Sequence, residues 1–347
     1  MTPADAPTQS PAVVERVLRG IERFCFAPAR AAPFAVLRIG LAAVLLAQAL
    51  QIAPVFHALY HHEGLLRGSL MDSFGPNHLP ALGRVLSALA GRGVAESAVL
   101  STCGVLYLGS LLGLLLGWRT RFVTVAAWLL HLFFMMLAPY TTYGADDFAN
   151  IFLFYSMFAP LGAASSLDHR SGRTADAPSA TNRLALRVMQ VHLCIAYLFS
   201  GVQKALGEQW WTGEAIWRSL MVHGYQLFDF TWLAHCPALA AIVGWLVLVI
   251  EIGYPVCIWP RRTRRPWIAA VVGLHAGIVV FMGLHVFGAL MIVLTVAMFG
   301  VSAEPEAGGR SGARRGTPTR PPVQGRSVRV GSWPGVKVQP PAPTGQS

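Results

Sequence analysis

Residues 196–213 form the segment AYLFSGVQKALGEQWWTG, and this segment decides the fold. An apolar run reaches a lysine, Lys204, and two adjacent tryptophans, Trp210 and Trp211, follow it. Tryptophan concentrates at the boundary between a bilayer and water, because its ring is largely apolar and its N–H is polar. The segment is therefore typical of a transmembrane helix that ends in an aromatic interfacial belt.

The composition of the whole chain also indicates a membrane protein. Hydrophobic residues make up 54% of the 347 residues and charged residues only 12%, whereas a soluble domain carries about 25% charge. The formal net charge is +11, but the basic residues lie in short clusters, and no motif of a nucleic-acid-binding module accompanies them. We therefore expect the lipid bilayer as a partner and no nucleic acid.

Apolar runs along the chain predict an all-α, polytopic transmembrane helical bundle. About eight runs approach the ~17–25 residues that an α-helix needs to cross a bilayer. They are Pro33–Pro54, Ser97–Leu116, Arg121–Ala138, Asp147–Ala163, Leu184–Leu206, Pro237–Trp259, Trp267–Met282 and His285–Val301. The last two are short and closely joined, so they are also consistent with one broken helical hairpin.

Arginine clusters set the expected orientation. The N-terminal arm, the turn Arg261–Arg265 and the C-terminal tail are rich in arginine, whereas the connection at Asp146 and Asp147 has no basic residue. Under the positive-inside rule, both termini are cytoplasmic. The preference for arginine, alanine, glycine and proline favours a bacterial source. We therefore predict a multi-pass protein of the cell inner (plasma) membrane.

Three regions follow from these patterns. Residues 1–31 form a cytoplasmic amphipathic arm with apolar residues at helical spacing. Residues 32–302 form the transmembrane domain. Residues 303–347 form a basic tail rich in glycine, proline and arginine, which we expect to be disordered because it has almost no apolar pattern.

Ionisable residues within the runs are the candidates for function, because a charge at the membrane centre costs ~2.5–3.5 kcal/mol or more and usually faces the bundle interior. They are Arg38, His131, His192, Glu251 and His275. Glu251 and His275 are equally far from Thr263 in the sequence, so in an antiparallel helix pair they lie at equal depth. Two interpretations stay open for them, a hydrogen-bonded clamp between helices and a proton relay or ligand site.

Lysine is rare in this chain. Only Lys204 and Lys337 are present, and every other basic position except histidine is arginine. A lysine gives up its proton when it is desolvated, whereas an arginine does not. In one interpretation Lys204 extends its ammonium group to the lipid headgroups. In the other it lines a crevice, loses its charge and serves as a base.

His61, His62 and Glu63 offer metal-ligating atoms in one short stretch. Side chains of adjacent residues on a regular element point apart, so chelation would need a loop at this position. We therefore predict no metal site.

The segment IAYLFSGVQKALGEQWWTGEAI, residues 195–216, resembles the signature of the horizontally transferred transmembrane (HTTM), or vitamin K-dependent gamma-carboxylase-like, domain. The signature is an aromatic-rich span, then G-[VL]-x-K, then a tryptophan and a glycine. Other stretches that agree are FAVLRIGLA with Arg38, HHEGLLRG, YGADDFANIFLFYSMFAPLGAASSLD, and VIEIGYP with Glu251. The resemblance covers about Phe24–Gly300.

The resemblance implies an intramembrane bundle with an outward-facing site. In the animal carboxylase, the lysine of the motif starts the reaction by deprotonating vitamin K hydroquinone, which then reacts with O₂, and a glutamate is carboxylated. The catalytic residues implied here are Lys204 and Asp147, the latter near the position of a functional histidine. The implied substrate-binding residues are Asp146, Trp211, Gly201 and Gly213.

The chain departs from the carboxylase at two points. It has ADDF where the carboxylase has N-N-H-x-Y, and we expect no lumenal domain for recruiting a protein substrate. We therefore expect an enzyme of the carboxylase-like type that uses a reduced quinone or a lipid-borne small molecule. The alternative is a non-catalytic membrane protein, such as a transporter, a small-molecule binder or an accessory subunit.

Overall fold

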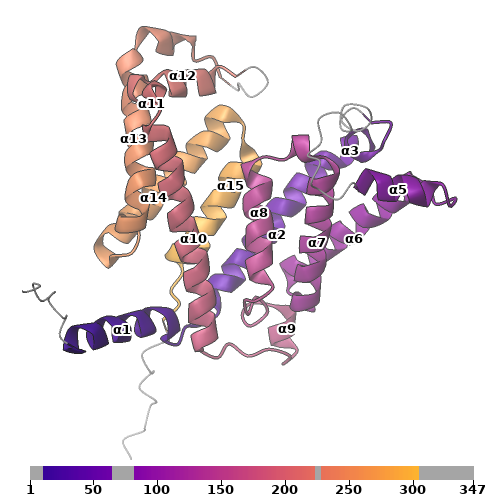
Figure 1. The fold of residues 1–347 in the computed structure, drawn as a ribbon, viewed down its shortest axis with the longest axis horizontal. Helices are drawn as coiled ribbons and strands as arrows, with labels where there is room; N and C mark the ends of the chain where they lie inside the picture. The colour runs from indigo at the N-terminus through magenta and orange to yellow at the C-terminus, as the bar shows by residue number, and fades with distance from the viewer. Residues whose placement is uncertain (1–10, 65–81, 223–227, 305–347) are drawn as a thin grey trace, which may run out of the picture. The chain divides into compact units, whose positions relative to one another are not determined.

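The computed structural model describes residues 11–64, 82–222 and 228–304 (Figure 1). These residues form helices joined by turns, with one isolated bridge between Ala29 and Ser179. They belong to one compact unit, Met1–Pro305. The predicted all-α class is confirmed. The tail predicted for 303–347 lies, from residue 305 onward, outside the described residues.

Six helices of the described part are long and apolar enough to cross a bilayer. They are α2 (Ala32–Ile52), α6 (Glu96–Leu116), α7 (Thr120–Leu137), α10 (Ala180–Ala205), α13 (Pro237–Cys257) and α14 (Arg261–Met282). The remaining two predicted runs form shorter helices, α8 (Gly144–Ser156) and α15 (His285–Thr295), the latter continued by a π-helical turn, Val296–Gly300. At ~1.5 Å per residue, α8 covers only about two thirds of a ~30 Å hydrocarbon core. A full count of eight crossings stays a prediction.

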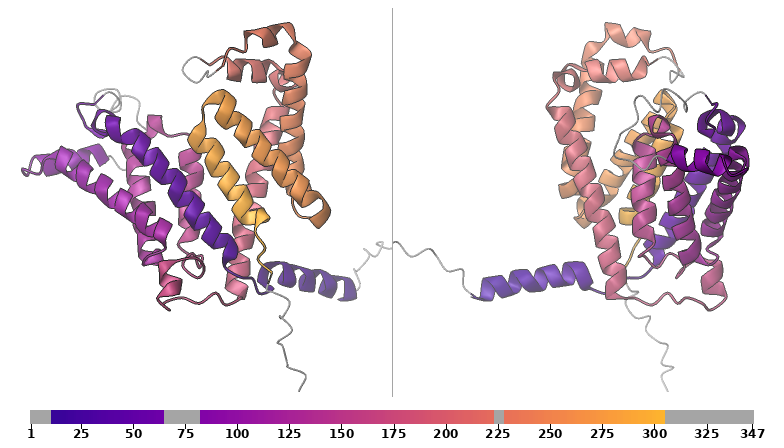
Figure 2. Two further views of the ribbon diagram at one scale, coloured as in Figure 1. Left: turned by 180° about the vertical axis from the view of Figure 1, so that it is seen from behind. Right: turned by 45° about the vertical axis from the view of Figure 1, so that its right-hand side comes forward.

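The long helices pack as neighbouring pairs (Figures 1 and 2). Helix α10 packs along α13, α14 along α15, and α6 along α7, while α2 contacts both α6 and α15. Helix α1 (Pro11–Phe26) lies across one end of the bundle against α10. At the other end, the short helices α11 (Glu208–Thr212) and α12 (Glu214–Leu220) pack on α13. These two short helices cover the end of α10 that carries Lys204.

Arg38 clamps the end of the bundle opposite to α11 and α12. The residue is fully buried in α2, and its guanidinium group donates hydrogen bonds to the main-chain oxygens of Leu114, Leu115, Leu161 and Ser165. The last carbonyl groups of a helix have no partner within that helix, and the clamp satisfies those at the end of α6. Arg38 therefore has a structural role, since all of its donor groups face main-chain oxygens.

Asp168 makes a second clamp beside it. Its carboxylate, in the short helix α9 (Leu167–Arg170), accepts hydrogen bonds from the main-chain N–H groups of Arg119 and Thr120, from the Thr120 hydroxyl and from Arg173. Burial by itself raises the pKa of Asp168, but these four hydrogen bonds outweigh that effect and lower the pKa to about 2. The carboxylate thereby fixes the N-terminus of α7.

The Asp168 clamp predicts a specific dependence of stability on pH. Because the folded-state pKa is depressed, the clamp stabilises the fold fully above the unfolded-state pKa, near 4, and its contribution is lost as the pH falls toward 2. We expect Asp168→Asn to lower the free energy of unfolding by about 2 kcal/mol at neutral pH. The variant should also flatten the pH dependence of the melting temperature between about pH 4 and pH 2.

Thermal unfolding of the detergent-solubilised protein at a series of pH values measures both effects. Glu214→Gln is the matched control, because that carboxylate forms an exposed ion pair with Arg218, which contributes little to stability. An Asp168→Asn variant as stable as the Glu214→Gln control would contradict the clamp.

Candidate functional site

Lys204 and Glu251 form an ion pair between α10 and α13. The Nζ atom of Lys204 lies 2.7 Å from Oε2 and 2.9 Å from Oε1 of Glu251, and it also donates to the Ser200 hydroxyl. The Lys204 side chain is 24% exposed and that of Glu251 only 10%. The indole ring of Trp210 lies 5.4 Å from the same Nζ atom, a distance at which a cation is attracted to an aromatic face. The amine is thus held within the bundle, and this pairing does not fit an extension to the lipid headgroups.

Two glycines allow α13 to approach closely enough for this pair. A Cβ atom on Gly201 would lie 2.8 Å from Cγ1 of Ile252 and 3.0 Å from Cβ of Glu251, so only glycine fits at this crossing. Gly213 has φ +85° and packs against the backbone of α13 at Ala241, a combination that also requires glycine. The sequence implied substrate contacts for both glycines, but the structure places them at helix–helix contacts.

The ion pair lies on the wall of a cavity of about 760 Å³. Helices α10, α12, α13, α14 and α15 contribute most of the residues around it. The wall is mainly apolar, with bulky side chains such as Phe199, Trp210 and Phe287. Its polar residues include Ser200, Gln203, Lys204, Ser219, Glu251 and His275. The cavity therefore combines an apolar interior with a small group of polar side chains, as small-molecule sites do.

His275 lines the same cavity but does not bond to Glu251. Its Nε2 atom lies 2.8 Å from the hydroxyl oxygen of Tyr197, whereas Glu251 is paired with Lys204. The predicted hydrogen bond between Glu251 and His275 is therefore wrong, although both residues reach one site. His275 is only 3% exposed, and its Nδ1 atom has no hydrogen-bond partner among the described residues. The ring therefore keeps one buried polar atom unsatisfied within the described part of the chain.

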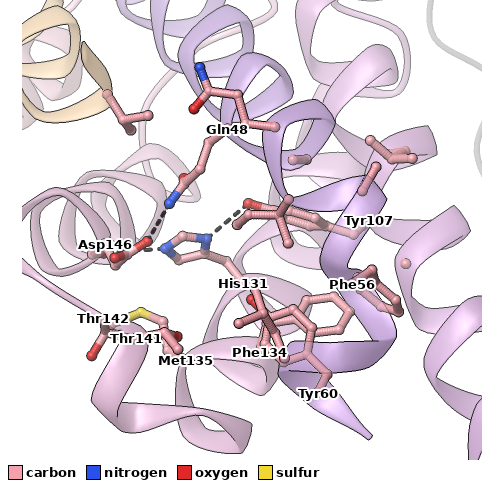
Figure 3. Close-up of a pocket in the computed structure, with 18 of the residues that line it drawn as sticks. Gln48, Phe56, Tyr60, Tyr107, His131, Phe134, Met135, Thr141, Thr142 and Asp146 are labelled. Carbon is pink, nitrogen blue, oxygen red and sulfur yellow. Dashed lines mark hydrogen bonds between the residues drawn. The ribbon is translucent and has the colours of Figure 1, made fainter. Parts of the chain in front are cut away.

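Asp146 lies at a second, separate cavity of about 470 Å³ (Figure 3). Its carboxylate accepts a hydrogen bond from Gln48 on α2, and its main-chain oxygen lies 3.2 Å from Nε2 of His131. The other ring nitrogen of His131 lies 2.9 Å from the hydroxyl oxygen of Tyr107. The carboxylate also caps the start of α8 by accepting from the main-chain N–H of Tyr143. This polar chain joins α2, α6, α7 and α8, and each of its links is satisfied within the protein.

Neither of the two predicted aspartates is among the residues that line the Lys204 cavity. Asp146 lines the second cavity, not the one that contains Lys204. Asp147 is exposed, because consecutive residues on a helix point about 100° apart. The predicted roles of these aspartates in catalysis and substrate binding therefore gain no geometric support.

Two further predicted residues have local partners. Nδ1 of His192 lies 3.0 Å from the hydroxyl oxygen of Tyr155, which links α10 to α8. Trp211 is half exposed and donates to the main-chain oxygen of Ala205. Its neighbour Trp210 lines the cavity instead. Of the two adjacent tryptophans, Trp210 and not the predicted Trp211 therefore reaches the cavity.

Two residues of α10 that were not predicted from the sequence, Ser200 and Tyr197, also lie at the Lys204 cavity. Ser200 and Tyr197 precede Lys204 by four and seven residues in α10, and residues at this spacing share one face of a helix. Both residues line the Lys204 cavity. The helical period from Lys204 was a signal that could have identified them.

These features define a multi-pass helical membrane protein with an ionisable pair at the wall of an apolar cavity. A family model of the HTTM domain matches residues 93–302, and the chain belongs to this family. The matched residues include both members of the ion pair. No curated protein and no solved structure matches the chain.

The ion pair predicts strong coupling between its two members. Removing one partner leaves a largely buried charge without compensation, which is strongly destabilising. Replacing both partners leaves no buried charge. We expect Lys204→Met and Glu251→Gln each to destabilise the protein. The double variant should lose less free energy of unfolding than the two single variants lose together, by at least about 1 kcal/mol. Unfolding of the four proteins in mixed micelles of increasing denaturing detergent measures this cycle. Additive effects would show that the pair is not coupled.

Proposed function

We propose that this chain is a membrane enzyme that acts on a reduced quinone or a similar lipid-borne hydroxyl compound, with the Lys204–Glu251 pair accepting the proton. The single observation that carries the proposal is the position of this pair at the wall of a mainly apolar cavity. Ionisable residues at membrane depth are rare and usually mark a functional path. A proton acceptor of this kind suits a substrate that arrives through the lipid.

The cavity has suitable dimensions and chemistry for such a molecule. Its volume of about 760 Å³ lies within the range of ~300–1,000 Å³ for small-molecule sites. Aromatic and aliphatic walls favour a ring with an apolar tail, while the partly exposed amine of Lys204 offers a hydrogen bond to a ring oxygen. A reduced quinone would supply an acidic hydroxyl group and reducing electrons at this position. The residues present therefore fit the group that the family resemblance implies.

The pair has a chemical advantage over an isolated lysine. One proton is shared between the amine and the carboxylate, and a neutral amine arises when that proton lies on Glu251. Lys204 then takes the proton of a bound hydroxyl group, which leaves an ammonium group beside a carboxylic acid. The hydroxyl of Ser200, which accepts from Nζ, keeps the amine oriented throughout. Trp210 shields the same group from water on one side.

A second candidate function rests on the same pair. A lysine and a glutamate that exchange a proton within a bundle are also a means of coupling a transporter to protons. In that case the purified protein in vesicles would move protons together with a solute and would oxidise no hydroquinone. Glu251→Gln would then abolish the proton flux. Measuring hydroquinone oxidation separates the two functions, because only the enzyme oxidises the quinol.

The test uses Lys204→Arg in vesicles that contain a reduced quinone and are supplied with O₂, which accepts the electrons and provides the epoxide oxygen, with quinol oxidation and epoxide formation followed together. Arginine keeps the positive charge opposite Glu251 but does not release its proton. We therefore expect normal folding and a loss of turnover of at least about 100-fold, the usual contribution of a positioned proton acceptor. Lys337→Arg is the matched control, since it changes the only other lysine.

Two results would contradict the proposal. One is a Lys204→Arg protein that turns over as fast as Lys337→Arg. The other is a wild-type protein that oxidises none of a series of reduced benzoquinones and naphthoquinones, although it is folded by the unfolding assay.

A further inference from the structure

We infer that His61, His62 and Glu96 form a binding site for a divalent transition metal of the zinc class, apart from both cavities. The three residues each offer one ligand atom, and these atoms lie within 4.8 Å of one another. Nδ1 of His62 is 2.7 Å from Oε2 of Glu96. Two imidazoles and a carboxylate form a ligand set that zinc uses in proteins. The site is thus defined by geometry and by donor type together.

The local backbone explains how adjacent histidines serve one ion. Helix α3 (Phe56–Tyr60) ends just before them, and His61 has the extended backbone angles φ −76° and ψ 148°. The chain then turns through His62 and Glu63, and the imidazole rings of His61 and His62 lie 4.4 Å apart. The loop that chelation would need is therefore present. The prediction of no metal site assumed a regular element at this position.

The carboxylate partner comes from a distant part of the chain. The sequence suggested Glu63, but the side chain nearest to His62 is that of Glu96, in the first turn of α6. Glu96 is 6% exposed at its side chain, and the N-terminus of a helix favours a negative charge. Glu63 remains close, with Oε1 3.7 Å from the second ring nitrogen of His62. A metal bound through Nδ1 of His62 would leave that nitrogen to donate to Glu63, as outer partners of metal-bound histidines do.

The arrangement also leaves room for a further ligand. Tetrahedral zinc with bond lengths of ~2.0–2.1 Å holds its ligand atoms about 3.3 Å apart. Binding would therefore widen the 2.7 Å distance between His62 and Glu96 and draw in the remaining atoms, which lie within 4.8 Å. Three protein ligands leave a fourth position open, as in zinc sites that bind water or substrate. A recess of about 520 Å³ lies beside the cluster and is lined by residues that include His57, His61 and Glu63. The recess borders only His61 among the three ligands.

The simpler account of the same geometry is a histidine–glutamate ion pair. The two accounts differ because a metal replaces the proton on the histidine and requires all three side chains, whereas an ion pair requires only His62 and Glu96. Binding of zinc and its dependence on His61 therefore decide between them.

The test is a titration of the tag-free, full-length protein with zinc after treatment with a chelator. We expect one zinc ion per chain, measured by mass spectrometry of the metal, and at least tenfold weaker binding for His61→Gln, His62→Gln and Glu96→Gln. Substitution by Co²⁺ should give the absorption bands of a tetrahedral site, and these bands should be lost in the same variants. His235→Gln is the matched control, because this histidine is exposed elsewhere in the chain.

Three outcomes would overturn the inference. They are the absence of stoichiometric zinc binding, binding that is unchanged by His61→Gln, and binding that His235→Gln weakens to the same extent. Glu96 is buried and its replacement can impair folding, so the decision rests on His61→Gln, which alters only a residue in a turn. Thermal unfolding of each variant shows whether it is folded before titration.

Discussion

The structure depends on one constraint, that a charge within an apolar bundle needs an opposite charge or hydrogen bonds that satisfy it. Lys204 and Glu251 satisfy this constraint for each other. The pairing requires α10 and α13 to lie in close contact, which Gly201 permits by having no side chain. Because the pair occupies the crossing, its free side faces the cavity formed with α14 and α15. The same interaction therefore stabilises the helix contact and provides the chemistry of the site.

Polar groups at the opposite end of the bundle have a different role. Arg38 and Asp168 direct their donor and acceptor atoms at main-chain groups at helix ends and at a few neighbouring side chains. These two side chains fix the end of α6 and the start of α7, and neither is among the described residues that line the two large cavities. The Asp146 chain (Figure 3) is likewise satisfied within the protein. The Lys204 cavity differs from both, since a partly exposed ion pair, Lys204 with Glu251, lies at its wall. This difference is the reason for assigning function to the Lys204 cavity.

The sequence predicted the helices well but the contacts between them poorly. Apolar runs determine where a membrane helix lies, and the rarity of lysine singled out Lys204. The depth of a residue in the membrane also follows from its distance along the helix. Glu251 and His275, predicted to lie at equal depth, do line one cavity. The rotation of each helix about its own axis, however, could not be predicted from the apolar runs. That rotation directs Glu251 to Lys204, turns Trp210 rather than Trp211 to the cavity, and separates Asp146 from Asp147. The turn at His61 depends likewise on where α3 ends.

The central claim is that a bound hydroxyl compound passes its proton to the Lys204–Glu251 pair. Infrared difference spectroscopy of the protein with and without hydroquinone, in the wild type and in Glu251→Gln, tests it most directly. The account predicts a carboxylic-acid carbonyl band in the bound wild-type protein that is missing in the variant. A bound protein in which Glu251 gives only carboxylate bands would contradict the account.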